Sequence, residues 1–346
     1  MKLIYSGSVK DLYQKDASLF FEYSNRYSIF DWGEMPDEIP YKGEALASMA
    51  ASFFEYLKTK DISSHYKGIA SKTSIEVAAV KVLRPSWQND SYNYAEYAAK
   101  PSGILVPLEV IFRRHLGQGN SLEGRLKKNP AYLADLGLEA IPTAADSFVP
   151  PIIEFSTKLE SSDRYLTRAE IAAMDILSDE ELQNLRLQTQ AVALELEKLF
   201  ASFGVKLWDG KLEFAFGAKD ASSGHRALLL VDSIGPDELR LTYEGLPLSK
   251  EFLRQIYAPS TWAASVKAAK ELAVTRKTQE WKKICSEELG EVPKKLSAEQ
   301  IAVSSLLYQA LANEVAHAVG RDKPFAADLN LPLWHQKAQA LLQRTP

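Results

Sequence analysis

The sequence predicts an α+β protein, because strands and helices follow one another in mixed order without a regular strand–helix repeat. Apolar and polar residues alternate near the N-terminus, over 104–114 and over 205–231, as expected of strands. A helical period replaces this alternation over 43–57, over 178–199 and through much of the chain beyond residue 249. With 346 residues, of which 46% are hydrophobic and 25% charged, the chain can form one large core or two modest ones.

Bulk composition excludes several classes of protein. A net charge of −4 and a pI near 5.9 give no general signal for a nucleic-acid or membrane partner. The one cysteine, Cys285, excludes an intramolecular disulfide and a multi-cysteine metal site, which favours the cytoplasm. No apolar run is long enough for a secretory or membrane-spanning segment. We therefore expect a soluble, cytoplasmic protein.

The first hundred residues read mainly as strands around one helix. The predicted elements are a strand–turn–strand at 3–13, strands at 19–23 and 27–30, a helix at 43–57, and strands within 73–83. The segment 85–101 is polar and aromatic without periodicity, so we place a boundary between two lobes near residue 100.

The remainder alternates strands with longer helices. The predicted elements are strands at 104–114 and 152–155, a helix started by Ser178 and Glu181, a hairpin within 205–231, and helices starting at Ser249 and Ser297. We expect an N-terminal β-rich lobe over 1–100, an α+β lobe over 101–257 and a helical extension over 258–346 that packs on the second lobe. The apolar stripes of that extension leave two alternatives open, a packed core or a surface for assembly into a homo-oligomer.

The hairpin carries the densest group of chemically useful side chains. Lys211 and Glu213 lie on one face of its first strand, and Asp232 follows its second strand. A turn near residues 220–222 would bring Glu213 opposite the end of the second strand. Two carboxylates beside an ammonium group suit a hard cation that bridges nucleotide phosphates. A solvated strand face with a turn carboxylate is the alternative, and spacing alone does not decide between them.

A glycine turn near the N-terminus has the character of an anion site. Gly7 allows backbone N–H groups to approach a phosphate closely, and Lys10 supplies a positive charge. The segment matches no GxxxxGK[ST] loop and precedes no helix, so it is not a Walker motif. The alternative is an edge-strand turn with a solvated lysine.

A second candidate anion site follows the strand at 104–114. Arg113 and Arg114 end this strand, and the loop after it contains Gly119 and Ser121. Guanidinium groups, a glycine-permitted backbone approach and a hydroxyl suit a phosphomonoester. Arg240 is another cation near the end of the hairpin. The alternatives are a solvated arginine pair for the first group and a local ion pair for Arg240.

Other catalytic chemistries have no local support. The five histidines show no metal-ligand spacing, and no Ser/His/Asp or Cys/His arrangement is evident. A kinase-like enzyme would share the glycine loop, lysine and carboxylates, but it would also need an HRD-type catalytic loop. The sequence contains no such loop.

Several sequence blocks occur together in an order typical of one family. They are YSGSVKDLY, NRYSIFDW, IPYKGEAL, VPLEVIFRRHLGQGNSL, PIIEFSTKLE, DGKLEF and LLVDSIGPDELR. In this order they closely resemble the phosphoribosylaminoimidazole-succinocarboxamide synthase (SAICAR synthetase) family. The resemblance covers about residues 1–257, and the residues beyond match no motif of the family.

The resemblance implies a two-lobe, ATP-grasp-like α+β enzyme of purine biosynthesis with ATP held between the lobes. Its expected ligands are ATP, Mg²⁺, carboxyaminoimidazole ribonucleotide (CAIR) and L-aspartate, with no nucleic acid or membrane. The family joins the carboxylate of CAIR to the amine of aspartate and releases ADP and phosphate. Because a carboxylate is a poor acyl donor, we expect an acyl-phosphate intermediate, which requires positioning and charge neutralisation more than a protein nucleophile.

Matching motifs also imply residue roles, all of them carried over from the family. The expected sites are Lys211 and Lys10 in catalysis; Lys10, Gly7, Val106, Glu109 and Glu213 at the nucleotide; Glu213 and Asp232 at the metal; Arg113, Ser121 and Arg240 at the ribonucleotide phosphate; and Lys158, with Asp163, near the amino acid.

Some positions depart from the family pattern. Ser8 replaces a residue that is often basic, Asn25 replaces an acid, and Ser233 replaces the second acid of an Asp-Glu pair. Asp209-Gly210 also reads as a two-residue hairpin turn, which conflicts with the continuous strand that the resemblance implies. These departures leave two further alternatives: an ATP-dependent ligase for a different carboxylate or amine, and a nucleotide-binding regulator without catalysis.

Overall fold

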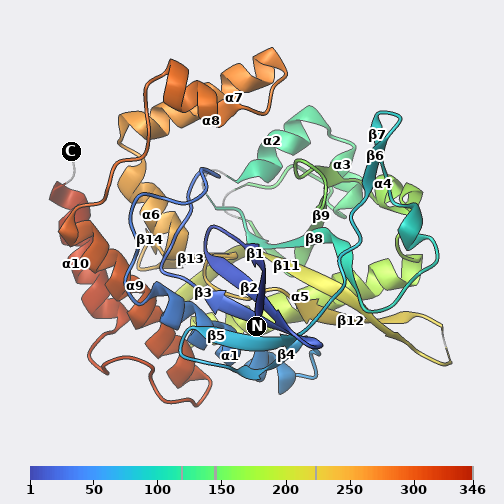
Figure 1. Cartoon of the computed structure of the whole chain (residues 1–346), viewed down its shortest axis with the longest axis horizontal. Helices are drawn as coiled ribbons and strands as arrows, with labels where there is room; N and C mark the ends of the chain where they lie inside the picture. The colour runs from blue at the N-terminus through green and yellow to red at the C-terminus, as the bar shows by residue number, and fades with distance from the viewer. Residues whose placement is uncertain (118–119, 144–145, 223, 345–346) are drawn as a thin grey trace. The chain divides into compact units, whose positions relative to one another are not determined.

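The structure is a computed structural model that describes residues 1–117, 120–143, 146–222 and 224–344. Up to residue 100 its elements are β1 (Lys2–Ser6), β2 (Lys10–Lys15), β3 (Ser18–Tyr23), α1 (Lys42–Lys58), β4 (Tyr66–Ile69), β5 (Ser74–Ala78), β6 (Ser86–Gln88), β7 (Ser91–Asn93) and η1 (Ala95–Tyr97) (Figure 1).

Beyond residue 100, strands alternate with helices until the chain becomes helical. These elements are β8 (Ile104–His115), α2 (Ser121–Lys128), α3 (Tyr132–Asp135), β9 (Ser147–Thr157), β10 (Tyr165–Leu166), α4 (Arg168–Ala173), α5 (Asp179–Ala201), β11 (Val205–Lys219), β12 (Arg226–Val231), β13 (Leu239–Tyr243), β14 (Leu246–Pro247), α6 (Ser249–Tyr257), α7 (Thr261–Arg276), α8 (Trp281–Lys283), η2 (Ile284–Glu288), α9 (Ala298–Ala318) and α10 (Leu331–Arg344). The α+β class is confirmed, and the strand pairs β1–β2, β2–β3, β8–β9, β8–β11 and β11–β12 are antiparallel.

The chain falls into two compact units, each assembled from separate stretches. The first comprises residues 1–52, 68–77 and 242–346, and the second comprises residues 53–67 and 78–241. The functional division at about residues 100 and 257 stays a prediction. Within the described residues, no helix combines the length and apolar character needed to cross a membrane.

The first unit contains the N-terminal sheet, with strand order β1-β2-β3-β5-β4. The predicted strand–turn–strand around Gly7 is confirmed, but the strand predicted at 27–30 is wrong. Tyr27 and Ile29 are buried as a strand would require. However, Phe30 and Asp31 have φ values of 53° and 63°, which place the backbone in the left-handed region and end any extended segment.

Gly43, in the IPYKGEAL block, is required because a side chain would not fit where the N-terminal sheet meets helix α1. A Cβ atom at this position would lie 2.6 Å from the carbonyl oxygen of Tyr23. The Gly43 N–H donates to Oδ1 of Asn25, at 3.1 Å. The amide at Asn25, where the family has an acid, thus supplies an acceptor oxygen that a carboxylate would also supply.

The C-terminal helices provide much of the core of the first unit. Helix α9 begins with the predicted capping box of Ser297 and Gln300. Its residues are buried along most of its length, and α10 packs against it (Figure 1). Trp262 and Trp334 are among the largest fully buried side chains. These contacts favour the core alternative for the apolar stripes of the extension.

The second unit is organised around the long strands β8, β9 and β11. The sheet order is β10-β9-β8-β11-β13-β14, and β12 pairs with β11. Helix α5 packs along β9, β8 and β11 (Figure 1), with Arg186 lying over the ring of Phe155. This helix starts with the predicted capping box of Ser178 and Glu181.

The hairpin of β11 and β12 has the predicted register, with Glu213 paired with Val231. The alternative of a turn at Asp209-Gly210 is wrong, because both residues lie inside β11 and pair with residues of β8. Glycine is required here for space: a Cβ atom at Gly210 would lie 2.4 Å from Cδ2 of Leu239 and 2.7 Å from Cζ of Phe112.

Candidate active site

One face of the second unit's sheet is lined by charged side chains. Strand register places three rows across β9, β8 and β11: Ser156–Glu109–Glu213, Glu154–Ile111–Lys211 and Ile152–Arg113–Asp209. Because side chains alternate between the two faces of a strand, these residues share one face. The residues between them, such as Phe155 beneath Arg186 of α5, belong to the opposite, apolar face.

Two glutamates face each other across β8 and β11, and two lysines lie between them. Lys211 donates to Oε1 of Glu109 at 2.6 Å, and Lys158 donates to Oε1 of Glu213 at 2.5 Å. Nζ of Lys158 also lies 3.9 Å from Glu109. Like charges directly opposite each other repel, so the ammonium groups hold this pair together. Glu109, predicted at the nucleotide, thereby directs its carboxylate towards the lysines.

The electrostatics of this cluster are unusual. Burial, followed by the charge of the Asp232 carboxylate, raises the pKa of Glu213 to about 7, although Lys158 and Lys211 oppose the shift. Burial alone would lower the pKa of Lys211, but the charges of Glu109 and Glu213 outweigh it and raise that pKa. The cluster therefore combines a firmly protonated ammonium with a carboxylate that is costly to ionise.

Asp232 lies at the end of β12, directly after the residue paired with Glu213. Its φ of 62° is unfavourable for a residue with a side chain, although aspartate tolerates it better than most. Its carbonyl oxygen lies 3.0 Å from Nε2 of His65, and Ser233 after it is buried. Strained backbone at a strand end beside charged groups is frequent at functional sites.

The carboxylates fit a magnesium ion that is shared with phosphates. No group of three or more His, Cys, Asp or Glu side chains in the described part of the chain is arranged to hold a metal. Mg²⁺ is usually held by one or two carboxylates together with water and substrate phosphates. Glu213 and Asp232 provide such a pair, and a cation would oppose both the burial and the Asp232 charge that raise the pKa of Glu213.

The predicted phosphate-binding arginines are joined by carboxylates. Arg113 donates from Nε to Glu154 at 2.5 Å and from one amino group to Asp209 at 3.2 Å. Arg240 donates to the same oxygen of Asp209, at 2.9 Å. A Cβ atom at Gly117 would lie 3.4 Å from Cδ of Arg240, so this glycine leaves room for the arginine.

Ser121 is connected to this group by a residue that the sequence did not single out. Arg125, one turn further along α2, donates to the hydroxyl of Ser121 at 2.7 Å and also to Glu154. The predicted Gly119 lies outside the described residues. Glu154 was also missed, although a lone acid inside the apolar run PIIEF signals a buried partner. Arg125 left no comparable signal.

The remaining predicted residues have varied surroundings. In the first unit, the Gly7 N–H donates to the carbonyl oxygen of Lys10 at 2.9 Å, so Gly7 forms the β1–β2 turn. The ammonium of Lys10 lies 4.6 Å from the ring centroid of Phe21. In the second unit, Val106 is fully buried in β8, and Asp163 is exposed in the loop after Lys158. Their ligand contacts stay predictions.

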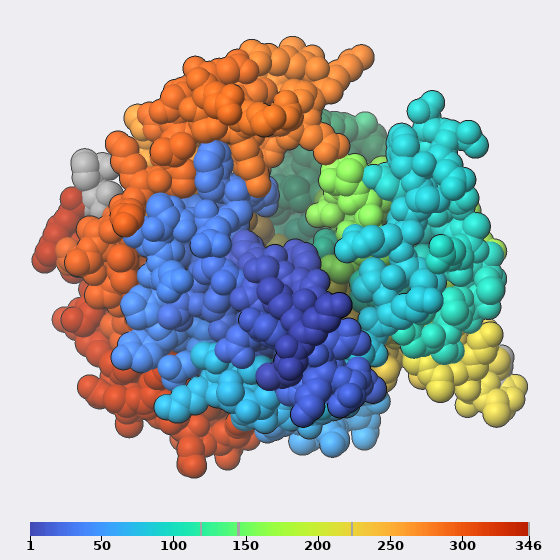
Figure 2. Space-filling view, in the orientation of Figure 1, coloured from blue at the N-terminus to red at the C-terminus, as the bar shows by residue number. Residues whose placement is uncertain are grey.

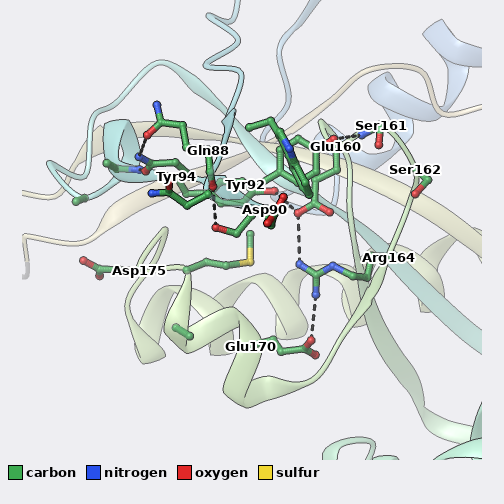
Figure 3. A pocket seen from close by; sticks show the side chains of 18 residues that line it. Gln88, Asp90, Tyr92, Tyr94, Glu160, Ser161, Ser162, Arg164, Glu170 and Asp175 are labelled. Atoms are coloured by element: carbon green, nitrogen blue, oxygen red, sulfur yellow. Dashed lines mark hydrogen bonds and ion pairs between the residues drawn. The ribbon is translucent and has the colours of Figure 1, made fainter.

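That loop also lines a cavity of about 910 Å³, between the β6–β7 hairpin and α4 (Figure 3). Tyr94 donates to Glu160 at 2.9 Å, and the hydroxyl of Tyr92 accepts from the N–H of Ser161 at 2.8 Å. The cyan hairpin segment lies beside the light-green loop segment in Figure 2. Arg164 donates to both Glu160 and Glu170, so these two acids of the cavity wall share one ion-pair partner. The hairpin therefore holds the loop that follows Lys158.

Comparisons with known proteins identify the family. The family model for SAICAR synthetase matches residues 3–269, which is most of the chain. The chain belongs to the SAICAR synthetase family. This membership makes the protein an ATP-dependent ligase of purine biosynthesis, as the sequence blocks predicted.

Relatives and solved structures extend the match. A protein of Archaeoglobus fulgidus assigned as phosphoribosylaminoimidazole-succinocarboxamide synthase is 35% identical over 92% of this chain and 96% of its own length. The enzyme of Thermoplasma acidophilum is 32% identical over 74% of this chain and 83% of its own. The Archaeoglobus alignment covers so much of the chain that it must continue beyond residue 257, where recognisable motifs end.

Solved members of the SAICAR synthetase family share the fold. The enzyme of Saccharomyces cerevisiae, solved with SAICAR, has a TM-score of 0.63 at 19% identity and covers 94% of this chain and 96% of its own. A SAICAR synthetase solved with ADP has a TM-score of 0.54 at 22% identity, covering 84% of this chain and 99% of its own.

Proposed function

We propose that this chain joins the carboxylate of CAIR to the amine of L-aspartate, converting ATP to ADP and phosphate and yielding SAICAR. Family membership supports the reaction class. The observation that carries the proposal is the sheet face on which Lys158, Lys211, Glu109 and Glu213 adjoin the linked arginines. Such a face offers charge neutralisation for phosphates, which phosphoryl transfer needs more than a protein nucleophile.

The chemistry proceeds in two balanced steps. A carboxylate oxygen of CAIR attacks the γ-phosphorus of ATP, and the bond from phosphorus to the bridging oxygen breaks, giving an acyl phosphate and ADP. The aspartate amine then attacks the acyl carbon, the carbon–oxygen bond to phosphate breaks, and the nitrogen loses a proton. The protein's task is to position the reactants and to stabilise the phosphoryl group in transit.

Each proposed role follows from the chemistry of its side chain. Lys211 and Lys10 would neutralise the transferring and the ATP phosphates, and Gly7 would let the β1–β2 turn approach them. Lys211 suits this role because its pKa is raised, so it stays charged at neutral pH. Val106 and Glu109 belong to the strand that would line the adenine pocket.

Glu213 and Asp232 would hold Mg²⁺, which when bound would neutralise phosphate charge. Arg113, Ser121 and Arg240 would grip the 5′-phosphate of CAIR, in keeping with the preference of guanidinium groups for phosphate. Lys158, with Asp163, would contact the amino-acid substrate. The ADP and SAICAR complexes reported for related proteins agree with a nucleotide and a ribonucleotide as ligands.

A direct assay tests the proposal. The purified chain is incubated with ATP, Mg²⁺, CAIR and, in separate reactions, aspartate, glutamate, asparagine and alanine, and ADP release and product mass are followed. We expect SAICAR and stoichiometric ADP with aspartate only. Turnover with another amine would assign a related ligase, and tight ATP binding without turnover would assign a regulator. Family membership does not favour either alternative.

We also propose a cytoplasmic location, which agrees with a single, buried cysteine and with the pathway of the family. Assembly into a homo-oligomer remains a proposal that the mass of the native protein in solution would test.

A further inference from the structure

Glu154 is the most deeply enclosed charge of the candidate phosphate site. Its side chain has 0% exposure, and it accepts hydrogen bonds from Arg113, Arg125 and the hydroxyl of Tyr132. Enclosing a carboxylate in this way costs several kcal/mol, and replacing a whole buried group of ion pairs by apolar residues is often neutral for stability. The orientation of two guanidinium groups therefore gives a better reason for a glutamate here than core stability does.

The charges form a continuous alternating series across the sheet face. From α2 to β13 the order is Arg125, Glu154, Arg113, Asp209 and Arg240. Three guanidinium groups and two carboxylates leave an excess of one positive charge. A phosphomonoester, which carries a charge of about −1.5 to −2 near neutral pH, is attracted to such an excess.

Arg125 has the features of a group held ready for an anion. Its guanidinium lies 3.5 Å from the ring centroid of Tyr165, a stacked position that fixes the plane of the group. It also donates to Ser121, which itself is predicted to bind phosphate. Its side chain is 21% exposed, compared with 4% for Arg113, so Arg125 is the more accessible of the two.

We propose that Arg125 is a further binding residue for the 5′-phosphate of the ribonucleotide, and that Glu154 is a positioning residue that aligns Arg125 and Arg113. The inference rests on the proposed function, since it assumes that the arginine series receives that phosphate. Arg125 adds a planar donor that is held by Glu154 on one side and by Tyr165 on the other.

The test measures binding of ribose 5-phosphate by calorimetry and the KM values for CAIR and ATP. Arg125→Ala should weaken ribose 5-phosphate binding and raise the KM for CAIR by about 10- to 100-fold, as expected for loss of a charged hydrogen bond, with the KM for ATP within twofold. Lys128→Ala removes the same charge from an exposed position on the same helix and should change neither value beyond twofold.

Glu154→Gln keeps the size of the side chain and removes its charge. We expect the KM for CAIR to rise at least threefold with the KM for ATP unchanged, a split that a purely structural role would not produce. Glu154→Asp withdraws the carboxylate from both arginines and is the second variant if the glutamine variant does not fold. Equal changes in both KM values would overturn the positioning role.

The outcomes separate this inference from the proposed reaction. Wild-type protein that binds ribose 5-phosphate and ATP but forms no SAICAR would refute the reaction, and weaker binding by Arg125→Ala would still support the inference. Ribose 5-phosphate binding by Arg125→Ala within twofold of wild type would overturn the inference even in a fully active enzyme. Failure of wild type to bind ribose 5-phosphate would overturn it as well.

Discussion

Glu213 is a buried carboxylate placed where the charge of Asp232 adds to its cost of ionisation. Burial and the neighbouring acid raise the pKa of Glu213 to about 7, and Lys158 limits the rise by donating to the same side chain. A site built to receive a cation needs this property, because carboxylates fully neutralised by protein groups would gain little from binding one. Lys158 and Lys211 donate to the glutamates of this cluster, and phosphate oxygens would accept hydrogen bonds from the same ammonium groups.

At this scale we predict that Glu213→Gln lowers kcat at least 100-fold, because one proposed metal ligand and one partner of Lys158 lose their charge. Steady-state ADP release with varied Mg²⁺ measures the effect. Glu139→Gln, on an exposed position of the same unit, should leave kcat unchanged. An unaltered rate in the Glu213 variant would remove this residue from the site.

The geometry of strand β11 depends on side-chain packing, whereas that of helix α5 depends on its cap and an ion pair. Strand β11 runs straight through Asp209-Gly210 because the side chains of Leu239 and Phe112 fill the space where a Cβ atom would be. Helix α5 begins at a serine cap, and Glu181 in its first turn also pairs with Arg226 of β12. The cap therefore joins the helix to the hairpin that carries the candidate site residues.

For strand β11 we predict that Gly210→Ala destabilises the protein by about 1–3 kcal/mol, because the new methyl group overpacks the core. Gly124→Ala is the matched control: it lies in helix α2, and its Cβ would meet no atom within 4 Å. Because alanine loses less backbone entropy on folding than glycine does, this control should be about 0.5–1 kcal/mol more stable. Urea unfolding measures both changes, and equal effects would contradict the packing argument.

For helix α5 we predict a pH-dependent contribution from Glu181. Burial would raise the pKa of its carboxyl, but hydrogen bonds from Arg226 and from the Ser178 backbone outweigh burial and lower that pKa to about 2. A depressed folded-state pKa stabilises the protein above the unfolded-state pKa and loses this effect as the pH falls through the folded value. The contribution is therefore full above about pH 5 and disappears towards pH 2, and a shift of this size corresponds to about 3 kcal/mol.

Glu181→Gln should accordingly reduce the free energy of unfolding by about 2–3 kcal/mol at pH 7, with the difference from wild type shrinking between pH 5 and pH 2. Asp179→Asn, an exposed acid in the same turn, should show a small difference at every pH. A difference for Glu181→Gln that stays constant with pH would exclude the ion pair as its cause.

At the scale of the whole molecule, the C-terminal helices belong to the core of a unit that also contains the N-terminal sheet. We predict that a chain ending at residue 258 no longer unfolds cooperatively. It should be insoluble, or it should bind dyes that detect exposed apolar surface. Removing an oligomerisation module would instead leave a folded monomer. Circular dichroism and light scattering of the truncated chain distinguish the two outcomes, and a folded, soluble product would contradict the core assignment.

Sequence alone determined the features that depend on local order. Period-two and helical patterns gave the long strands and the helices, two capping boxes marked α5 and α9, and the hairpin pattern placed Glu213 opposite the end of the second strand. Family blocks then supplied the reaction and its expected residues. The irregular segment at 27–30 was misread because buried alternating residues resemble a strand whatever their φ angles.

Only the tertiary structure decided which distant residues meet. Lys158 reaches Glu213, and Glu154 gathers Arg113 and Arg125, because β9, β8 and β11 are neighbours in the sheet. Local periodicity fixes the face on which a side chain lies, but strand order fixes its partner, and strand order depends on packing across the whole unit. The sequence thus named most of the charged groups on this sheet face, and the fold of the second unit brought those groups together.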